Sequence, residues 1–211
     1  MSQMSHRFAR MTSMMLQPAA MGAAFDHFRD ASAPAVRAQP GSLAILGGGN
    51  PDTGFGCAIS FWETLDSLER SNANPKVVEA MSGYAQWMAG PFRVESYSVT
   101  SGSPPDPDVA EPPQSWMRMT TATAAPGKLE TVLMSYSDRL DQARERSESC
   151  VWTTLLAPQI GSRILVIEQW TSLPALLAWE GASKDADQRL FRAEVLETPP
   201  VRDRLAVYGL Y

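Results

Sequence analysis

The chain contains one pattern twice, at a constant offset of 108 residues and without insertion or deletion. The repeated features include a tripeptide, a proline and a tryptophan: Arg10-Met11-Thr12 with Arg118-Met119-Thr120, Pro18 with Pro126, and Trp62 with Trp170. A repeat of this length exceeds the periods of solenoids and propellers and matches the size of a small domain. The sequence therefore predicts a tandem duplication in which each copy has its own core.

A proline-rich segment separates the copies. Residues 101–114 contain five prolines and three acidic residues, so they cannot bury much apolar area and should form an extended linker. We expect domain 1 to span residues 1–100 and domain 2 to span residues 115–211. The linker can reach at most about 45 Å, which is enough to bring the copies face to face.

Hydrophobic periodicity predicts the order β-α-β-β-α-β in each copy, the ferredoxin-like split unit. In copy one we expect strands over 8–16, 42–46, 56–62 and 93–100, helices over 21–36, 65–70 and 77–88, and a hairpin loop over 47–54. In copy two we expect strands over 116–124, 150–156, 163–170 and 204–210, and helices over 128–146 and 173–196.

A four-stranded sheet covered by helices on one face leaves its other face bare. Each Å² of apolar area left in water costs about 25 cal/mol, so the second copy is the natural cover for the first. The predicted fold class is α+β, with two ferredoxin-like domains packed sheet to sheet as an intramolecular version of a dimeric α+β barrel.

Composition limits the partners. Hydrophobic residues make up 44% of the chain and charged residues 19%, which favours compact folding over disorder. The net charge is −5 and no basic stripe is present, which argues against nucleic acid. No apolar run is long enough for a membrane span, and the Met-rich start does not have the form of a signal peptide.

The two cysteines and two histidines predict neither a disulfide framework nor a metal site. Cys57 and Cys150 are not equivalent positions of the repeat, and they show no Cys-x-x-Cys or Cys/His spacing. A reducing cytoplasm is the simplest compartment for such a chain.

Copy one contains a series of recognisable motifs: Phe61-Trp62-Glu63-Thr64, the following Ala73-Asn74-Pro75, a helix that contains Tyr84, and Gly90-Pro91 before the last strand. With these motifs copy one resembles the antibiotic biosynthesis monooxygenase family of dimeric α+β barrels. Copy two keeps Gln169-Trp170-Thr171-Ser172 but lacks the Asn-Pro and Gly-Pro pairs, so its resemblance is weaker. The resemblance implies oxygenase chemistry without a cofactor, on phenolic or anthrone-like molecules, or heme degradation.

The chain departs from the family pattern at one polar position. The resemblance implies an asparagine four residues before the tryptophan, where this chain has Ala58 and, in copy two, Val166. The heme-degrading branch also uses a histidine after the tryptophan, and this chain has none there, which argues against heme. We expect no cofactor and no metal.

Candidate catalytic residues are Trp62, Arg10 and Tyr84. An indole offers a flat apolar wall, and an inward-facing arginine can hold a carboxylate, phenolate or enolate. The alternative for Trp62 is core packing. For Arg10 and its equivalent Arg118, an ion pair with an acid of the opposite copy is favoured by their repetition.

Other residues are predicted to line the substrate pocket: Met14, Phe28, Trp87, Met88, Trp170 and Arg118. Helix-on-sheet packing explains the apolar members of this set equally well.

The leading hypothesis is a cofactor-independent monooxygenase-like enzyme that acts on an aromatic or polyketide-type small molecule in secondary metabolism, with its better pocket in copy one. The alternatives are a non-oxidative cyclase or isomerase on the same fold, and a non-catalytic ligand-binding barrel. The expected assembly is an intramolecular pseudo-dimer, and the sequence leaves a further homodimer open.

Overall fold

The computed structural model describes residues 7–106 and 115–211, which form two compact units. The described part of unit 1 comprises residues 7–98, 104–106 and 206–211, and that of unit 2 comprises residues 99–103 and 115–205. Of the segment expected to be a linker, residues 107–114 lie outside the described residues. Its first two residues, Ser101 and Gly102, instead complete a strand.

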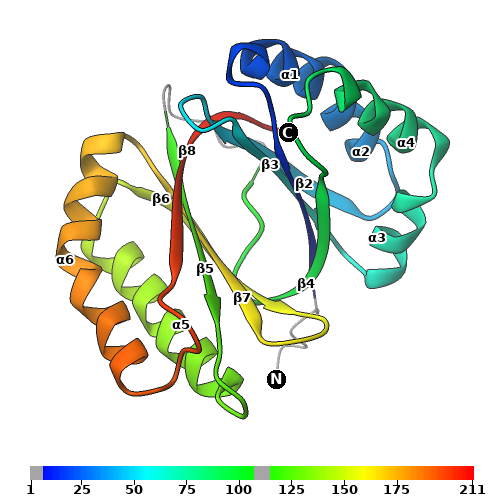
Figure 1. Ribbon diagram of the computed structural model, residues 1–211. Coiled ribbons are helices and arrows are strands. Elements are labelled where there is room, and N and C mark those ends of the chain that lie inside the picture. The colour runs from blue at the N-terminus through cyan, green and yellow to red at the C-terminus, as the bar shows by residue number, and fades with distance from the viewer. Residues whose placement is uncertain (1–6, 107–114) are drawn as a thin grey trace. The chain divides into compact units, whose positions relative to one another are not determined.

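Unit 1 has the expected β-α-β-β-α-β order (Figure 1). Its strands are β1 (Phe8–Met15), β2 (Ser42–Asn50), β3 (Phe55–Trp62) and the first part of β4 (Arg93–Gly102), whose last residues belong to unit 2. The first helical region joins η1 (Pro18–Ala20), α1 (Met21–His27), η2 (Phe28–Ser32) and α2 (Ala33–Arg37). The second joins α3 (Leu65–Asn72), α4 (Pro75–Ser82) and η3 (Gly83–Gln86). In the sheet β1 lies between β4 and β3, and β2 lies beyond β3.

Unit 2 repeats this order with longer helices. It contains β5 (Trp116–Thr123), α5 (Leu129–Arg146), β6 (Cys150–Pro158), β7 (Arg163–Trp170), α6 (Leu173–Arg192) and the start of β8 (Val201–Leu210). The central strands follow the order β5-β7-β6, with β8 beside β5. The ferredoxin-like fold predicted for each copy is confirmed.

Strand register confirms the offset of 108. Phe8 faces Trp62 across β1 and β3, and Trp116 faces Trp170 across β5 and β7. Irregularities in the second strand of each unit fall between Ser42 and Ala44 and between Cys150 and Trp152. Isolated bridges join Leu16 to Met88 and Ala124 to Leu196, which explains why both second helical regions end before these residues.

The hairpin loop expected over 47–54 is wrong at its start, because Gly47, Gly48 and Gly49 extend β2. A Cβ atom on Gly47 would lie 2.5 Å from the ring of Phe28, and one on Gly49 would lie 2.6 Å from the methyl group of Met21. The glycines therefore let the first helical region approach the strand backbone closely. The turn itself is confined to residues 51–54.

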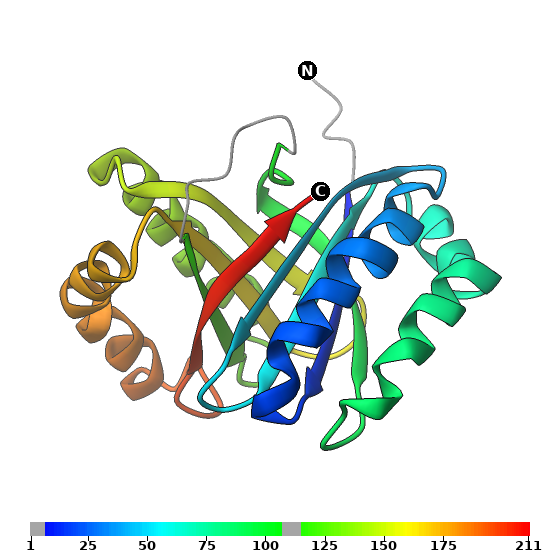
Figure 2. The same cartoon turned by 90° about the horizontal axis from the view of Figure 1, so that it is seen from above.

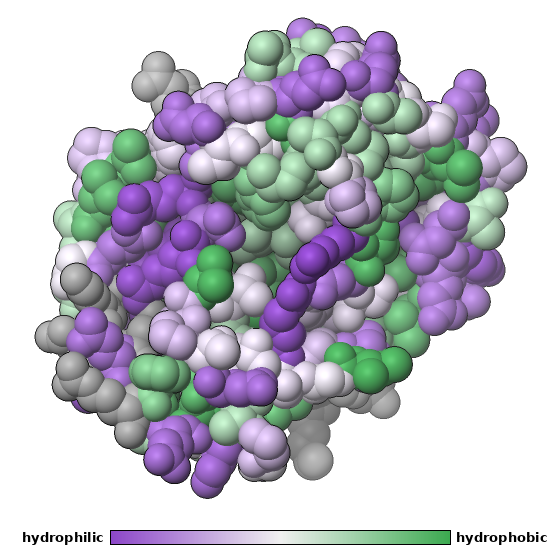
Figure 3. All heavy atoms as spheres, viewed as in Figure 1, coloured by the Kyte–Doolittle hydropathy of each residue, from purple (hydrophilic) through white to green (hydrophobic). Residues whose placement is uncertain are grey.

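The core of unit 1 lies between its sheet and its helices. Figure 2 shows α1 and α2, in blue, running beside α4, in green, over one face of the strands. Met14, Phe28, Trp62 and Tyr84 belong to this core. The outer surface over α1 and α4 carries many weakly hydrophobic side chains, seen in pale green in Figure 3.

Candidate functional site

A pocket of about 500 Å³ opens in unit 1 between β1, the start of β4, and helices α3 and α4. Its lining is mainly apolar and contains no acidic residue: Arg10, Thr12, Asn72, Val77, Val78, Met81, Ser82, Phe92 and Val94. This volume lies within the range that small-molecule sites occupy, about 300–1,000 Å³. Apolar walls with a few polar groups are typical of such sites.

Large apolar side chains at the pocket are exposed. Val78, Phe92 and Val94 have exposed fractions of 51%, 48% and 46%. Because these side chains gain from leaving water, they favour an apolar ligand at this opening.

Arg10 projects from β1 on the helix-covered side and is 7% exposed. Its Nη1 donates hydrogen bonds to Ser71 Oγ at 2.9 Å and to Asn72 Oδ1 at 2.5 Å, at the end of α3. Its Cζ lies 5.4 Å from the centre of the Trp62 ring, which is cation–π distance. Among the residues that the structure describes, no carboxylate pairs with Arg10.

Burial without a negative partner disfavours the charged form of this side chain. Desolvation lowers the pKa of Arg10 to about 10, so the guanidinium still carries its charge at neutral pH. A buried cation that lines a pocket and lacks a counter-ion attracts an anionic ligand, because the ligand supplies the missing charge.

Trp62 supports Arg10 and does not line the pocket. It is fully buried, and its indole nitrogen donates to Ser60 Oγ at 2.9 Å. Ser60 lies directly opposite Arg10 in the β1–β3 pairing. Trp62 thus holds the guanidinium from the core side.

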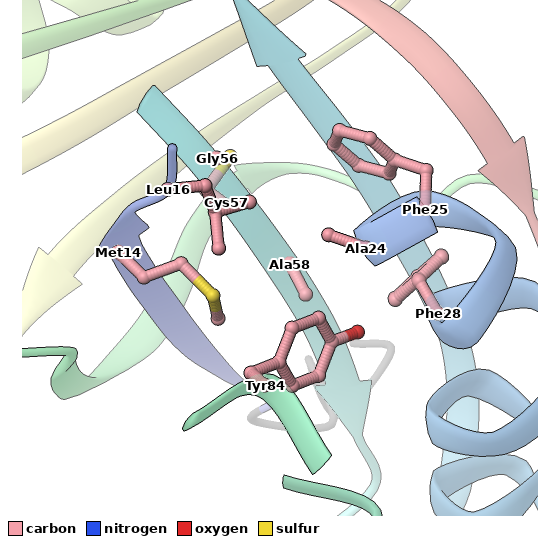
Figure 4. A pocket seen from close by; sticks show the side chains of 9 residues that line it. All are labelled: Met14, Leu16, Ala24, Phe25, Phe28, Gly56, Cys57, Ala58 and Tyr84. Carbon is pink, nitrogen blue, oxygen red and sulfur yellow. The ribbon is translucent and has the colours of Figure 1, made fainter. Parts of the chain in front are cut away.

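Three other predicted residues, Met14, Phe28 and Tyr84, surround a second, much smaller cavity (Figure 4). Ala58, where the resemblance implied an asparagine, lines it too. The cavity holds about 20 Å³, enough for about one water molecule, so it has no room for an aromatic substrate.

The Tyr84 hydroxyl accepts a hydrogen bond from Ser32 Oγ at 3.1 Å. Burial raises the pKa of Tyr84 to about 12, so its phenol remains protonated at neutral pH. Trp87 and Met88 are partly buried against the same core and do not line the 500 Å³ pocket.

Unit 2 surrounds the equivalent arginine differently. Arg118 forms an ion pair with Glu168, the residue opposite it in the β5–β7 pairing, and both side chains are 2% exposed. The indole of Trp179 donates to Glu168 Oε1 at 3.0 Å and packs against Trp170, with ring centres 5.7 Å apart. In this ion pair the acid comes from the same copy and not, as expected for Arg118, from the opposite copy.

Sequence reasoning missed the residues that make the copies unequal. Glu168 and Trp179 of unit 2 correspond at the offset of 108 to Ser60 and Ser71 of unit 1. Asn72, Phe92 and Val78 were missed as well, because none belongs to a recognised motif. A position-by-position comparison of the copies would have found the two serines.

Two negative findings concern the described residues only. No group of three or more histidine, cysteine, aspartate and glutamate side chains there is placed to hold a metal ion. No helix in residues 7–106 and 115–211 has both the length and the apolar character needed to cross a membrane.

One family model matches a segment within copy two. Residues 116–184 match the family described as antibiotic biosynthesis monooxygenase, which confirms the resemblance inferred from sequence. The match falls on copy two, although the residue patterns made copy one look closer. No functionally curated protein matches the chain by sequence.

Solved structures resemble the chain over nearly its whole length. A "putative monooxygenase" from Fusobacterium nucleatum subsp. nucleatum shares 9% identity with a TM-score of 0.76, and the match covers 99% of this chain and 95% of that one. One from Lactobacillus acidophilus shares 9% identity with a TM-score of 0.72, covering 97% and 95%. An anthrone oxidase-like protein shares 15% identity with a TM-score of 0.73, covering 99% and 94%. These likenesses show the fold.

Proposed function

We propose that this chain, whose second half carries an antibiotic biosynthesis monooxygenase domain, is a monooxygenase-like enzyme that acts on an aromatic small molecule in the pocket of unit 1. The observation that carries the proposal is the buried guanidinium of Arg10, which lines an apolar pocket of about 500 Å³ and has no carboxylate partner among the described residues. The anthrone oxidase-like neighbour supports an anthrone-type or phenolic substrate.

The proposed reaction needs no metal or flavin, because the substrate itself supplies the electrons. A phenolic anthrone ionises to an enolate, whose carbon is electron-rich enough to react with dioxygen. The ring methylene becomes a carbonyl: one oxygen atom enters it and the other leaves as water with the two methylene hydrogens. Arg10 stabilises the negative charge of the enolate, and the apolar walls exclude water.

An oxygen electrode tests this function directly. With 1,8-dihydroxyanthrone as substrate, the protein should accelerate oxygen uptake above the uncatalysed rate, and Arg10→Gln should reduce the acceleration at least tenfold. Arg70→Gln is the matched control, because Arg70 forms an exposed ion pair with Asp66 and does not line the pocket. Oxygen uptake equal to the buffer rate would rule out the proposed reaction on this substrate.

Ala58 favours one alternative, a non-oxidative cyclase or isomerase. The asparagine that the resemblance implies is replaced there by a side chain with no polar group, in a cavity too small for substrate. Product formation at an equal rate under nitrogen would select this alternative over the oxygenase. Saturable binding without turnover in either gas would select the ligand-binding barrel.

A further inference from the structure

The side chains around Arg118 in unit 2 indicate which kind of ligand could bind at Arg10 in unit 1. In unit 2, Nε and Nη2 of Arg118 both contact Oε2 of Glu168, while Oε1 of this carboxylate accepts the indole N–H of Trp179. The Trp179 ring lies against Trp170 at an angle of 31°. A carboxylate and a flat aromatic ring thus fill the surroundings of this arginine.

Unit 1 has neither the carboxylate nor the second tryptophan at the equivalent positions. Serines replace the glutamate and the second tryptophan, as Ser60 and Ser71. The Ser60 hydroxyl accepts from the Trp62 indole, and the Ser71 hydroxyl donates to the Leu68 carbonyl at 2.7 Å. Neither serine supplies a negative charge to Arg10.

Arg10 and Arg118 use different nitrogens of the guanidinium group for their hydrogen bonds. All hydrogen bonds of the Arg10 side chain to described residues come from Nη1. Its Nε and Nη2, which correspond to the nitrogens that Glu168 contacts on Arg118, have no partner there. Two adjacent N–H groups of a guanidinium suit a carboxylate, with hydrogen bonds that its charge strengthens.

The pocket offers a second polar contact beside Arg10. Thr12 stands two residues further along β1, so its side chain points to the same side of the sheet, and it lines the pocket. Its hydroxyl makes no hydrogen bond to a described residue and can therefore bind a ring substituent. Val77, Met81 and Phe92 supply apolar walls for the ring.

We infer that the unit 1 pocket binds an aromatic carboxylate, with its carboxylate on Nε and Nη2 of Arg10, and that Glu168 and Trp179 are the built-in replacement for this ligand in unit 2. The inference rests on the pocket assigned under the proposed function, but it concerns binding and requires no turnover. It also explains why one copy is open and the other filled.

Calorimetry at pH 7.5 with 2-naphthoate and its neutral methyl ester tests the inference. The wild-type protein should bind the acid at least tenfold more tightly than the ester, and Arg10→Gln should remove this preference. Equal affinity for acid and ester, or an acid preference that survives in Arg10→Gln, would overturn the inference.

Ser60→Glu gives unit 1 the carboxylate of unit 2 and provides a second test. This variant should weaken naphthoate binding at least tenfold, whereas the uncharged Ser60→Gln should weaken it less than threefold. Equal effects of the two substitutions would show that size and not charge closes the site, and would contradict the inference. Circular dichroism establishes that each variant is folded, and Arg10→Gln decides alone if neither Ser60 variant folds.

The two proposals fail in different ways. Acid-selective binding without oxygen uptake upholds the ligand class and rejects the oxygenase. Oxygen uptake from a neutral anthrone, with no preference for acid over ester in binding, upholds the oxygenase and rejects the aromatic carboxylate.

Discussion

Arg10 and Arg118 stand at equivalent positions on β1 and β5, and only Arg118 has a carboxylate opposite it. Desolvation lowers the pKa of Arg10 from the usual arginine value to about 10. A shift of this size corresponds to a cost on the order of 3 kcal/mol. The cost applies at every pH below about 10, where the folded and unfolded chains both carry the proton, and it is relieved as pH rises above about 10, where the folded chain loses this proton first.

Methionine substitutions at the two arginines should therefore have different effects on stability. Arg10→Met removes a buried cation that has no carboxylate partner among residues 7–106 and 115–211, so the free energy of unfolding at pH 7 should stay the same or rise by about 1–2 kcal/mol, net of its lost hydrogen bonds. Arg118→Met leaves Glu168 buried without its partner and should lower the free energy of unfolding by about 3–5 kcal/mol. Urea unfolding measures both values, and equal losses would contradict the difference in charge environment.

Tyr84 gives a prediction about alkaline pH. Its phenol has a pKa raised to about 12, so between pH 10 and 12 the folded chain keeps a proton that the unfolded chain loses. Stability should fall across this interval by on the order of 2 kcal/mol more in the wild type than in Tyr84→Phe. Thermal unfolding of both proteins from pH 9 to 11.5 measures the difference. Parallel curves would mean that the Tyr84 phenol ionises as readily as an exposed tyrosine.

The glycines of strand β2 leave room for helix side chains to pack against the strand. A side chain on Gly47 would meet the buried ring of Phe28, whereas a Cβ on Gly22, on the exposed face of α1, would meet nothing within 4 Å. Gly47→Ala should lower the free energy of unfolding by about 1–3 kcal/mol through overpacking. Gly22→Ala should raise it by about 0.5–1 kcal/mol through helix propensity. Chemical denaturation measures the free energy of unfolding of both variants. If Gly47→Ala raised it as much as Gly22→Ala, Phe28 would have to move aside without cost.

The elements themselves were largely predictable, because periodicity and the repeat report on local structure and on which face is buried. Strand β7 (Arg163–Trp170) was predicted at its observed bounds. The glycines of β2 were assigned to a loop because their composition is typical of turns. Their place in a strand depends on Phe28 and Met21, which lie far from them in the sequence.

The site was less predictable than the fold, because it depends on which side chains meet. Arg10 was identified from its place on the first strand. Its contacts with Ser71 and Asn72 depend on where α3 ends relative to β1, which no local pattern encodes. Tyr84 and Phe28, expected to line a substrate pocket, line one cavity that is too small for an aromatic substrate.

At the scale of the whole molecule, the compact units do not coincide with the two copies of the repeat. Residues 99–103, which comprise the end of copy one and the start of the expected linker, belong to unit 2, where Thr100 Oγ1 donates to the Leu155 carbonyl at 3.0 Å. Residues 206–211, from the end of copy two, belong to unit 1. Each unit is thus completed by a strand end that the sequence of the other copy supplies.

Removal of residues 206–211 should consequently damage unit 1, although these residues end copy two. Ile45 and Tyr211 exchange two backbone hydrogen bonds of 2.8 and 2.9 Å, and the ring of Tyr208 stacks on Phe25 with centres 3.7 Å apart. A chain that ends at Leu205 leaves these groups of β2 and α1 unpaired, which should cost unit 1 about 2–3 kcal/mol.

Hydrogen exchange read by mass spectrometry locates the damage. The amides of β2 should lose protection at least tenfold in the shortened chain, while those of β7 in unit 2 should keep theirs. Tyr211→Phe is the matched control, because it preserves the backbone bonds and the ring and should leave β2 protected. Equal loss of protection in β2 and β7 would mean that the last six residues stabilise both units together. It would contradict the assignment of residues 206–211 to unit 1 alone.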